Sequence, residues 1–467
     1  MPLLFSAAAQ DCLKSPLILE MESLSQTPFH FFTCALFLLA IVHTLSVHWI
    51  RAWARALEIR QVPRRQGERS AGIQMLYFLS EVEMIFAFWA APLFFCVVAF
   101  YGWEAAFVYI NTRDYTEAMF VTVLLAIAST RPLIEFAEKT IRFSARLFGS
   151  SLSAWWFVLL TIGPLLGSII TEVGAMILCA LLLSKQFYEY RPSWELAYAT
   201  LGLLFVNISV GGTLTAFGSP AVLILSHAWG WKSIYMILNF GWKAVLSILV
   251  SNALYWFFFR KELLSLDARK RELETLRILR PTKVEESSIP HWIATVHLLF
   301  IALIVMVSHY PAIFLAFFFF FVAFHQVTRG HQSPIRLTRP ILVGLFIAGL
   351  TVHVGLQGWW VSKILHSLSP NGVLLASVVM TGFTDNAAIA ALGSLVPNWN
   401  DFYYYALFTG IIAGGGLSVI ANAPNPAGYS ILGRHFTGGI SPLKLFFSAV
   451  IPTVICYLIF FFLGPLF

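Results

Sequence analysis

The chain carries two glycine-rich breaks inside long apolar runs: GGTLTAFGSP at residues 211–220 and GGGLSVIANAP at residues 414–424. A hydroxyl residue and an acid precede each break, Thr171-Glu172 in the first half and Thr384-Asp385 in the second. One apolar run of helical length lies between each acid and its break. The same motifs in the same order indicate an internal duplication.

The residues around these motifs are strongly apolar. Of 467 residues, 58% are hydrophobic and only 11% are charged, and the mean hydropathy is +0.78. Soluble domains carry about 25% charged residues, so this chain cannot cover a water-exposed surface of its size. Runs such as 29–50 and 341–356 have the length of about 17–25 residues that crosses a bilayer. The sequence therefore predicts an all-α polytopic membrane protein.

Two apolar runs, 152–190 and 371–397, are interrupted by polar tips at residues 170–173 and 384–386. Broken backbone at membrane depth is tolerated only where protein or water covers it, so both runs are predicted to be re-entrant hairpins. With the first loop inside, all basic clusters then fall on the cytoplasmic side, as the positive-inside rule requires. These clusters are 51–69, 139–146, 185–191, 260–283, 329–339 and 434–444.

This topology leaves about ten spans with both termini outside, and makes the halves two inverted repeats of about five transmembrane helices plus one hairpin each. Residues 260–289 form a linker rich in Arg, Lys and Glu at helical spacing, which predicts a solvated helix joining the halves. The expected parts are N-terminal scaffold spans (1–114), a first repeat core (115–259, hairpin 152–190, broken helix 197–228), a cytoplasmic linker (260–289), scaffold spans (290–339) and a second repeat core (340–467, hairpin 371–397, broken helix 401–432).

The tips and breaks carry groups that bind ions. Glycine and proline in the breaks expose carbonyl oxygens and helix ends inside the membrane. A carboxylate there is costly unless it has a partner, so Asp385 and Glu172 indicate an ion or proton pathway. A carboxylate that holds either Na⁺ or H⁺, but not both, acts as an exchanger. The predicted ion-binding residues are Asp385, Asn386, Thr384, Thr171, Glu172, Gly212, Thr213, Thr215, Gly415, Ser418 and Asn422, with Asp385 and Asn386 as Na⁺ ligands.

Other ionisable residues lie within the predicted spans. Lys243 is in the middle of a span, and we expect it to be the counter-ion of Glu172 or Asp385, because an unpaired charge there is unfavourable. Glu81 and Glu83 are two residues apart and so face different sides of a helix. For these two acids, an ion pair and a proton path both remain open.

Several function classes lack their motifs. The sequence contains no HExxH, GxxxxGK[ST] or GxSxG, so we expect secondary transport and no enzyme activity. The five cysteines are scattered without a CxxC pair, which favours neither a zinc site nor a disulfide framework. We expect no cofactor beyond the transported Na⁺ and H⁺. The basic residues lie in loops of a membrane protein, so no nucleic-acid partner is expected.

The order of elements resembles the ion transporter superfamily. A span (116–129), an amphipathic in-plane stretch (132–148), an acid-tipped hairpin and a helix broken at GG-x-L-[ST] follow one another and then recur. Thr384-Asp385-Asn386-Ala387 is similar to the hairpin tip of NhaD-type sodium/proton antiporters, and the nearest family is the "putative Na+/H+ antiporter". The resemblance covers about 115–258 and 340–466.

The resemblance implies sodium/proton exchange, with Na⁺ or Li⁺ as the cation. It also implies an elevator mechanism, in which hairpins and broken helices move with the ion against a scaffold, and a homodimer in the bacterial inner membrane. The first tip, Thr171-Glu172-Val173, departs from the acid–Asn pattern of that family, and the second lacks a proline after Asn386.

Two other functions remain open. Sodium-coupled uptake of an organic anion such as a dicarboxylate occurs in a related branch of the superfamily, but hairpin tips there are typically neutral Ser-Asn-Thr. An acid at both tips would repel such a substrate. A membrane-embedded enzyme that uses Asp385 or a histidine is the third possibility, although the chain contains no acyltransferase-type HxxxxD.

Overall fold

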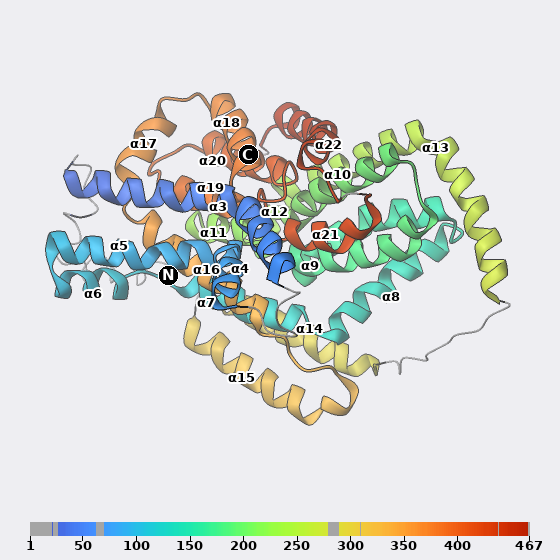
Figure 1. Cartoon of the computed structure of the whole chain (residues 1–467), viewed down its shortest axis with the longest axis horizontal. Coiled ribbons are helices and arrows are strands. Elements are labelled where there is room, and N and C mark those ends of the chain that lie inside the picture. The colour runs from blue at the N-terminus through green and yellow to red at the C-terminus, as the bar shows by residue number, and fades with distance from the viewer. Residues whose placement is uncertain are drawn as a thin grey trace. The chain divides into compact units, whose positions relative to one another are not determined.

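The computed structural model describes residues 21, 27–61, 70–278, 289–308, 310–437 and 439–465, and every regular element in these ranges is helical (Figure 1). The predicted all-α class is confirmed. The α-helices of the first half are α3 (Pro28–Gln61), α4 (Ala71–Leu79), α5 (Ile85–Tyr101), α6 (Trp103–Asn111), α7 (Thr116–Ala128), α8 (Arg131–Leu147), α9 (Leu152–Gln186), α10 (Trp194–Gly211), α11 (Pro220–Ala228), α12 (Ser233–Met236) and α13 (Trp242–Ile278).

The second half is also entirely helical in its regular elements within the described residues. Its helices are α14 (His291–Met306), α15 (Pro311–Val327), α16 (Thr338–Val354), α17 (Gly358–His366), α18 (Pro370–Phe383), α19 (Asn386–Ser394), α20 (Asp401–Gly414), α21 (Asn425–Leu432) and α22 (Pro442–Leu463). A bent pair precedes the tip in each half: α7 meets α8 at 65°, and α16 meets α17 at 82°. Short turns complete the set: η1 (Val82–Met84), η2 (Tyr188–Tyr190), η3 (Gly212–Leu214), the π-helical η4 (Ile237–Gly241), η5 (Arg329–His331) and η6 (Gly433–His435).

The described helices form two compact units. Unit 1 comprises the chain up to Met119 together with Ile341–Ser369 and Ala391–Asn398, and unit 2 comprises Phe120–Pro340, Pro370–Ala390 and Trp399–Phe467. Residues 290–339 lie in unit 2 and residues 341–369 in unit 1. The ranges expected from the sequence describe repeats and scaffold spans, not compact units, and stay a prediction. Both polar tips and both glycine-rich breaks belong to unit 2.

Unit 1 is held together by close helix packing. The Tyr109 hydroxyl donates a hydrogen bond to the Val352 carbonyl over 2.6 Å, which joins α6 to α16. A Cβ atom on Gly349 of α16 would lie 2.5 Å from the carbonyl carbon of Phe86 in α5, so only glycine permits this approach. An apolar core that includes Phe29, Leu93 and Tyr109 fills the interior.

Five helical segments of the described chain are long and apolar enough to cross a membrane, or seven if each bent pair is counted as one span. This number is lower than the ten predicted spans. Several apolar helices, such as α14 and α15, are shorter than the 18 residues that define a full span by length and composition. The chain is an integral, multi-pass membrane protein.

Helix α10 forms the centre of unit 2, since every residue from Leu196 to Gly211 is buried. Small residues allow this close packing: a Cβ atom on Gly202 would lie 2.5 Å from the Ser448 carbonyl oxygen of α22. Helix α8 is amphipathic, as predicted, and buries Leu133, Ala137, Ile141 and Ala145 at four-residue spacing.

The predicted linker begins as part of α13, and residues 279–288 lie outside the described part of the chain. The described portion is helical, as expected, but it is not simply solvated. Asp267 is buried and accepts a hydrogen bond from the Leu152 backbone N–H over 2.7 Å at the start of α9. Glu262 accepts hydrogen bonds from the backbone and hydroxyl of Ser193 at 2.7 and 2.9 Å. Two acids of α13 therefore hold the N-terminal ends of α9 and α10.

Candidate ion-binding site

Helix α9 folds back on itself at Thr171, within the tip predicted at residues 170–173. Thr171 has φ 65° and ψ 156°, a conformation that a β-branched residue rarely adopts. A Cβ atom on Gly167 would lie 3.4 Å from Ala175 Cβ, and one on Gly163 would overlap Cys179 Sγ. In a straight helix, residues 163 and 179 would be about 24 Å apart. The two arms of α9 are thus the arms of a hairpin.

The second tip joins α18 to α19. Asp385 is buried, and its Oδ1 accepts a hydrogen bond from the Ala387 backbone N–H over 2.8 Å. Thr171 accepts a hydrogen bond from the Gly174 backbone N–H over 3.4 Å at the first tip. Both side chains therefore cap the N-terminus of the helix that leaves the tip.

Two equivalent hydrogen bonds connect the tips to the breaks. The Glu172 N–H donates to the Gly218 carbonyl and the Asn386 N–H donates to the Ala421 carbonyl, both over 3.0 Å. Gly218 and Ala421 each lie seven residues after the first glycine of their break, Gly211 and Gly414. Glu172 therefore corresponds to Asn386, and Thr171 corresponds to Asp385. The pairing expected from the sequence, Thr171-Glu172 with Thr384-Asp385, is therefore wrong by one residue.

Glu172 lies at the centre of the site. Its side chain is buried, and its Oε2 accepts a hydrogen bond from the Asn422 side-chain amide over 2.8 Å. The Ser219 hydroxyl and the Asp385 carboxyl are both near enough to interact electrostatically with this carboxyl. A Cβ atom on Gly212 would lie 2.7 Å from Glu172 Cγ, so only a glycine at this position lets the first break pack this closely against Glu172. The two predicted acids are thus brought together.

Several buried polar atoms around the tips have no hydrogen-bond partner in the described part of the chain. These atoms are Glu172 Oε1, Asn386 Nδ2, Ser418 Oγ, Asn422 Oδ1, Thr381 Oγ1 and Asn425 Oδ1. Each such atom costs about 1–3 kcal/mol, which a bound ion or water would offset. The described residues contain no group of three His, Cys, Asp or Glu side chains that could hold a metal ion. Two carboxylates with amide and hydroxyl oxygens instead form a donor set that suits a hard cation.

Other predicted ligands have structural partners. Thr213 donates a hydrogen bond to the Val210 carbonyl, and Thr215 donates one to the Ser168 carbonyl, both over 2.8 Å. Thr384 is buried beside Asp385. A Cβ atom on Gly415 would lie 3.4 Å from Asn386 Nδ2, so this glycine lies against the second tip.

Sequence reasoning missed three residues that shape the site. The Ser168 hydroxyl donates to the Gly211 carbonyl over 2.8 Å and accepts from the Leu214 N–H over 3.0 Å, which fixes the first break against the hairpin. Asn425 donates to the carbonyls of Gly415 and Ser418, both over 2.8 Å, and so closes the second break. Ser209 of α10 donates to the Ile412 carbonyl of α20 over 2.9 Å. Polar residues inside apolar runs are the signal that could have found them.

Lys243 has different partners from those predicted. Its ammonium donates hydrogen bonds to the Tyr405 hydroxyl, over 3.1 Å, and to the Gly464 carbonyl. It also lies 4.6 Å from the centre of the Tyr405 ring. In the described part of the chain, no contact joins Lys243 to Glu172 or Asp385. Lys243 instead joins α13 to the end of α22. Glu81 forms an ion pair with Arg51 at 3.5 Å in unit 1.

Comparison with known proteins gives a family and one structural likeness. The family model described as "Putative Na+/H+ antiporter" matches residues 28–463, which is nearly the whole chain. Among solved structures, the chain is similar to the YdaH transporter of Alcanivorax borkumensis, described as having an unusual topology, with 14% identity and a TM-score of 0.40 over 90% of this chain and 97% of that chain. No curated protein matches the sequence.

Proposed function

Because the chain belongs to the family described as "Putative Na+/H+ antiporter", we propose that it exchanges Na⁺, or Li⁺, for H⁺ by secondary active transport. The observation that carries this proposal is the buried cluster in which Glu172 and Asp385 lie together among unpartnered amide and hydroxyl groups. Two nearby buried carboxylates bind either a cation or protons, but not both at the same time.

The exchange follows from competition at Glu172. Na⁺ binds to ionised carboxylates, with oxygen atoms of Asn422 and Ser418 completing the shell, and the protons leave. On the opposite side of the membrane, protons bind to the carboxyls and the cation dissociates. The Na⁺ ligands expected from the sequence are Asp385 and Asn386. We assign the principal role to Glu172, because it contacts groups from both breaks, whereas one Asp385 oxygen caps α19.

We further propose an elevator mechanism. Both tips and both breaks belong to one compact unit, which supports movement of the ion together with these elements. The homodimer, the bacterial inner-membrane location, the inverted relation of the halves and the external position of both termini are also proposals. The last two rest on the basic residues of the cytoplasmic loops.

Everted vesicles with an acidic interior provide the test. Addition of Na⁺ or Li⁺ should dissipate the pH gradient with the wild-type chain, and Glu172→Gln and Asp385→Asn should each abolish this response. Glu104→Gln and Asp401→Asn are matched controls, because these two acids are exposed at the starts of α6 and α20. Failure of every alkali cation to dissipate the gradient, with sodium-dependent succinate uptake instead, would support the organic-anion symporter and overturn the proposal.

A further inference from the structure

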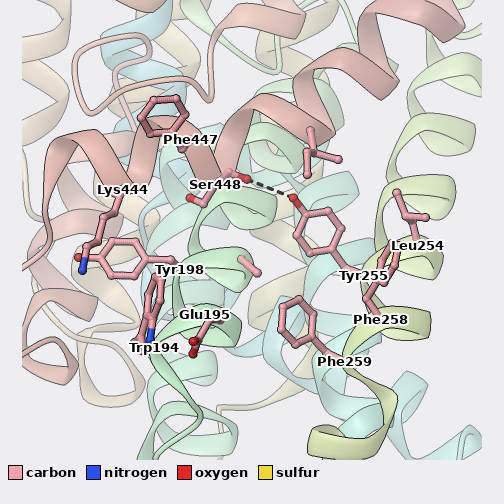
Figure 2. A pocket seen from close by; sticks show the side chains of 12 residues that line it. Trp194, Glu195, Tyr198, Leu254, Tyr255, Phe258, Phe259, Lys444, Phe447 and Ser448 are labelled. Carbon is pink, nitrogen blue, oxygen red and sulfur yellow. Dashed lines mark hydrogen bonds between the residues drawn. The ribbon is translucent and has the colours of Figure 1, made fainter.

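A groove of about 660 Å³ lies between α10, α13 and α22 in unit 2 (Figure 2). All three helices are among those long and apolar enough to cross a membrane. Figure 2 shows Trp194, Glu195 and Tyr198 on one side, Leu254 to Phe259 on α13, and Lys444 to Ser448 on α22. The groove is separate from the ion-binding residues described above.

The walls of the groove are aromatic and aliphatic. Phe258 is 69% exposed and Phe447 is 63% exposed, which is unfavourable in water but favourable against acyl chains. Between two of the lining residues, the Tyr255 hydroxyl donates a hydrogen bond to the Ser448 carbonyl over 3.3 Å. This contact joins α13 to α22 at the groove.

The rim of the groove carries two opposite charges. The Lys444 ammonium lies 4.8 Å from the centre of the Trp194 ring and 5.8 Å from that of Tyr198. Glu195 lies on the same rim. No ion pair joins Lys444 to Glu195 in the described part of the chain. Helices α10 and α22 both begin here, at Trp194 and Pro442, and their first turns add partial positive charge.

We propose that this groove binds a phospholipid with a phosphoethanolamine headgroup. An acyl chain lies along the aromatic walls, the phosphate faces Lys444 and the two helix N-termini, and the headgroup ammonium faces Glu195. The complementary pair of charges decides between lipid classes, because a purely anionic headgroup would leave Glu195 opposite a negative charge. The basic clusters near these helix ends place the site in the cytoplasmic leaflet.

Native mass spectrometry of the purified full chain, titrated with palmitoyl-oleoyl phosphatidylethanolamine or phosphatidylglycerol, tests this proposal. We expect at least tenfold tighter binding of the ethanolamine lipid. Glu195→Gln should remove this preference, and Lys444→Met should weaken binding of both lipids. Lys232→Met is the control, because this lysine is exposed at the start of α12 and lies outside the groove.

A variant that fills the groove separates lipid binding from folding. Ile451→Trp places a ring in the groove from the α22 wall and should displace the lipid, while an unchanged elution volume and thermal unfolding temperature in detergent show that the chain is folded. Equal or tighter binding of phosphatidylglycerol, or unchanged lipid binding in both Lys444→Met and Ile451→Trp, would overturn the proposal. None of these results bears on whether the chain exchanges Na⁺ for H⁺.

Discussion

The side-chain amide of Asn422 donates a hydrogen bond to Glu172 Oε2 over 2.8 Å, although 250 residues separate the two in the sequence. The carboxyl comes from the tip of the first hairpin and the amide comes from the second break. Each half of the chain therefore supplies one of the two groups in this contact. The site exists only when both halves are folded together.

Substitution of Asn422 tests this contact. Asn422→Ala removes a donor to a carboxylate, a bond worth about 1.5–3 kcal/mol, so we expect about 10- to 100-fold weaker apparent Na⁺ affinity in the vesicle assay. Asn111→Ala is the control, because Asn111 is exposed at the end of α6. An unchanged Na⁺ concentration dependence in Asn422→Ala would show that the amide does not act on the ion site.

Gly212 is the position where a small change should have a large effect. Gly212→Ala would bring a Cβ atom 2.7 Å from Glu172 Cγ and 2.9 Å from Cδ, so the carboxyl must move. We expect transport to be lost while the protein remains in the membrane, as judged by vesicle immunoblots and the pH-gradient assay. Gly433→Ala is the matched control, since a Cβ atom there has no neighbour within 4 Å. Equal activity of both variants would exclude close packing of the break against Glu172.

The fold-back of α9 can be tested by cross-linking. In a background without the natural cysteines, Gly167→Cys and Ala175→Cys should form a disulfide, because their Cβ atoms would be 3.4 Å apart and disulfides need about 3.5–4.5 Å. The same spacing in the continuous helix α10, Ala197→Cys with Phe205→Cys, should give no bond, since eight residues of helix span about 12 Å. Mass spectrometry of the oxidised protein distinguishes the two, and a straight α9 would leave both pairs reduced.

The acids of α13 should contribute to stability and not to ion binding. Asp267→Ala removes the acceptor for the Leu152 N–H at the start of α9, and losing such a cap costs about 0.5–2 kcal/mol. We expect a lower thermal unfolding temperature in detergent with an unchanged Na⁺ affinity. Glu272→Ala is the exposed control on the same helix. A change in Na⁺ affinity without a loss of stability would contradict this role.

Much of the fold could be predicted because its physical causes are local. Long apolar runs specify membrane helices, and the glycine and proline residues at 211–220 specify the break. The amphipathic spacing of α8 is equally local. The two acids could be predicted to share a site because a buried carboxylate needs partners.

The finer arrangement depends on contacts between distant residues. Thr384, Asp385 and Asn386 are all polar, so sequence alone does not fix which of them corresponds to Glu172. The hydrogen bonds to Gly218 and Ala421 fix it. Lys243 was expected to pair with an acid, but its long side chain reaches a carbonyl 221 residues away. Nothing in the residues around Lys243 indicates that partner.

Na⁺ binding to the purified protein as a function of pH tests most directly whether Na⁺ and H⁺ compete at Glu172. Isothermal titration calorimetry should show that the wild-type affinity for Na⁺ weakens progressively as the pH falls, with proton release on binding. Glu172→Gln should bind Na⁺ weakly at every pH and release fewer protons than the wild type. An affinity in Glu172→Gln that keeps the wild-type dependence on pH would contradict a central role for this carboxyl.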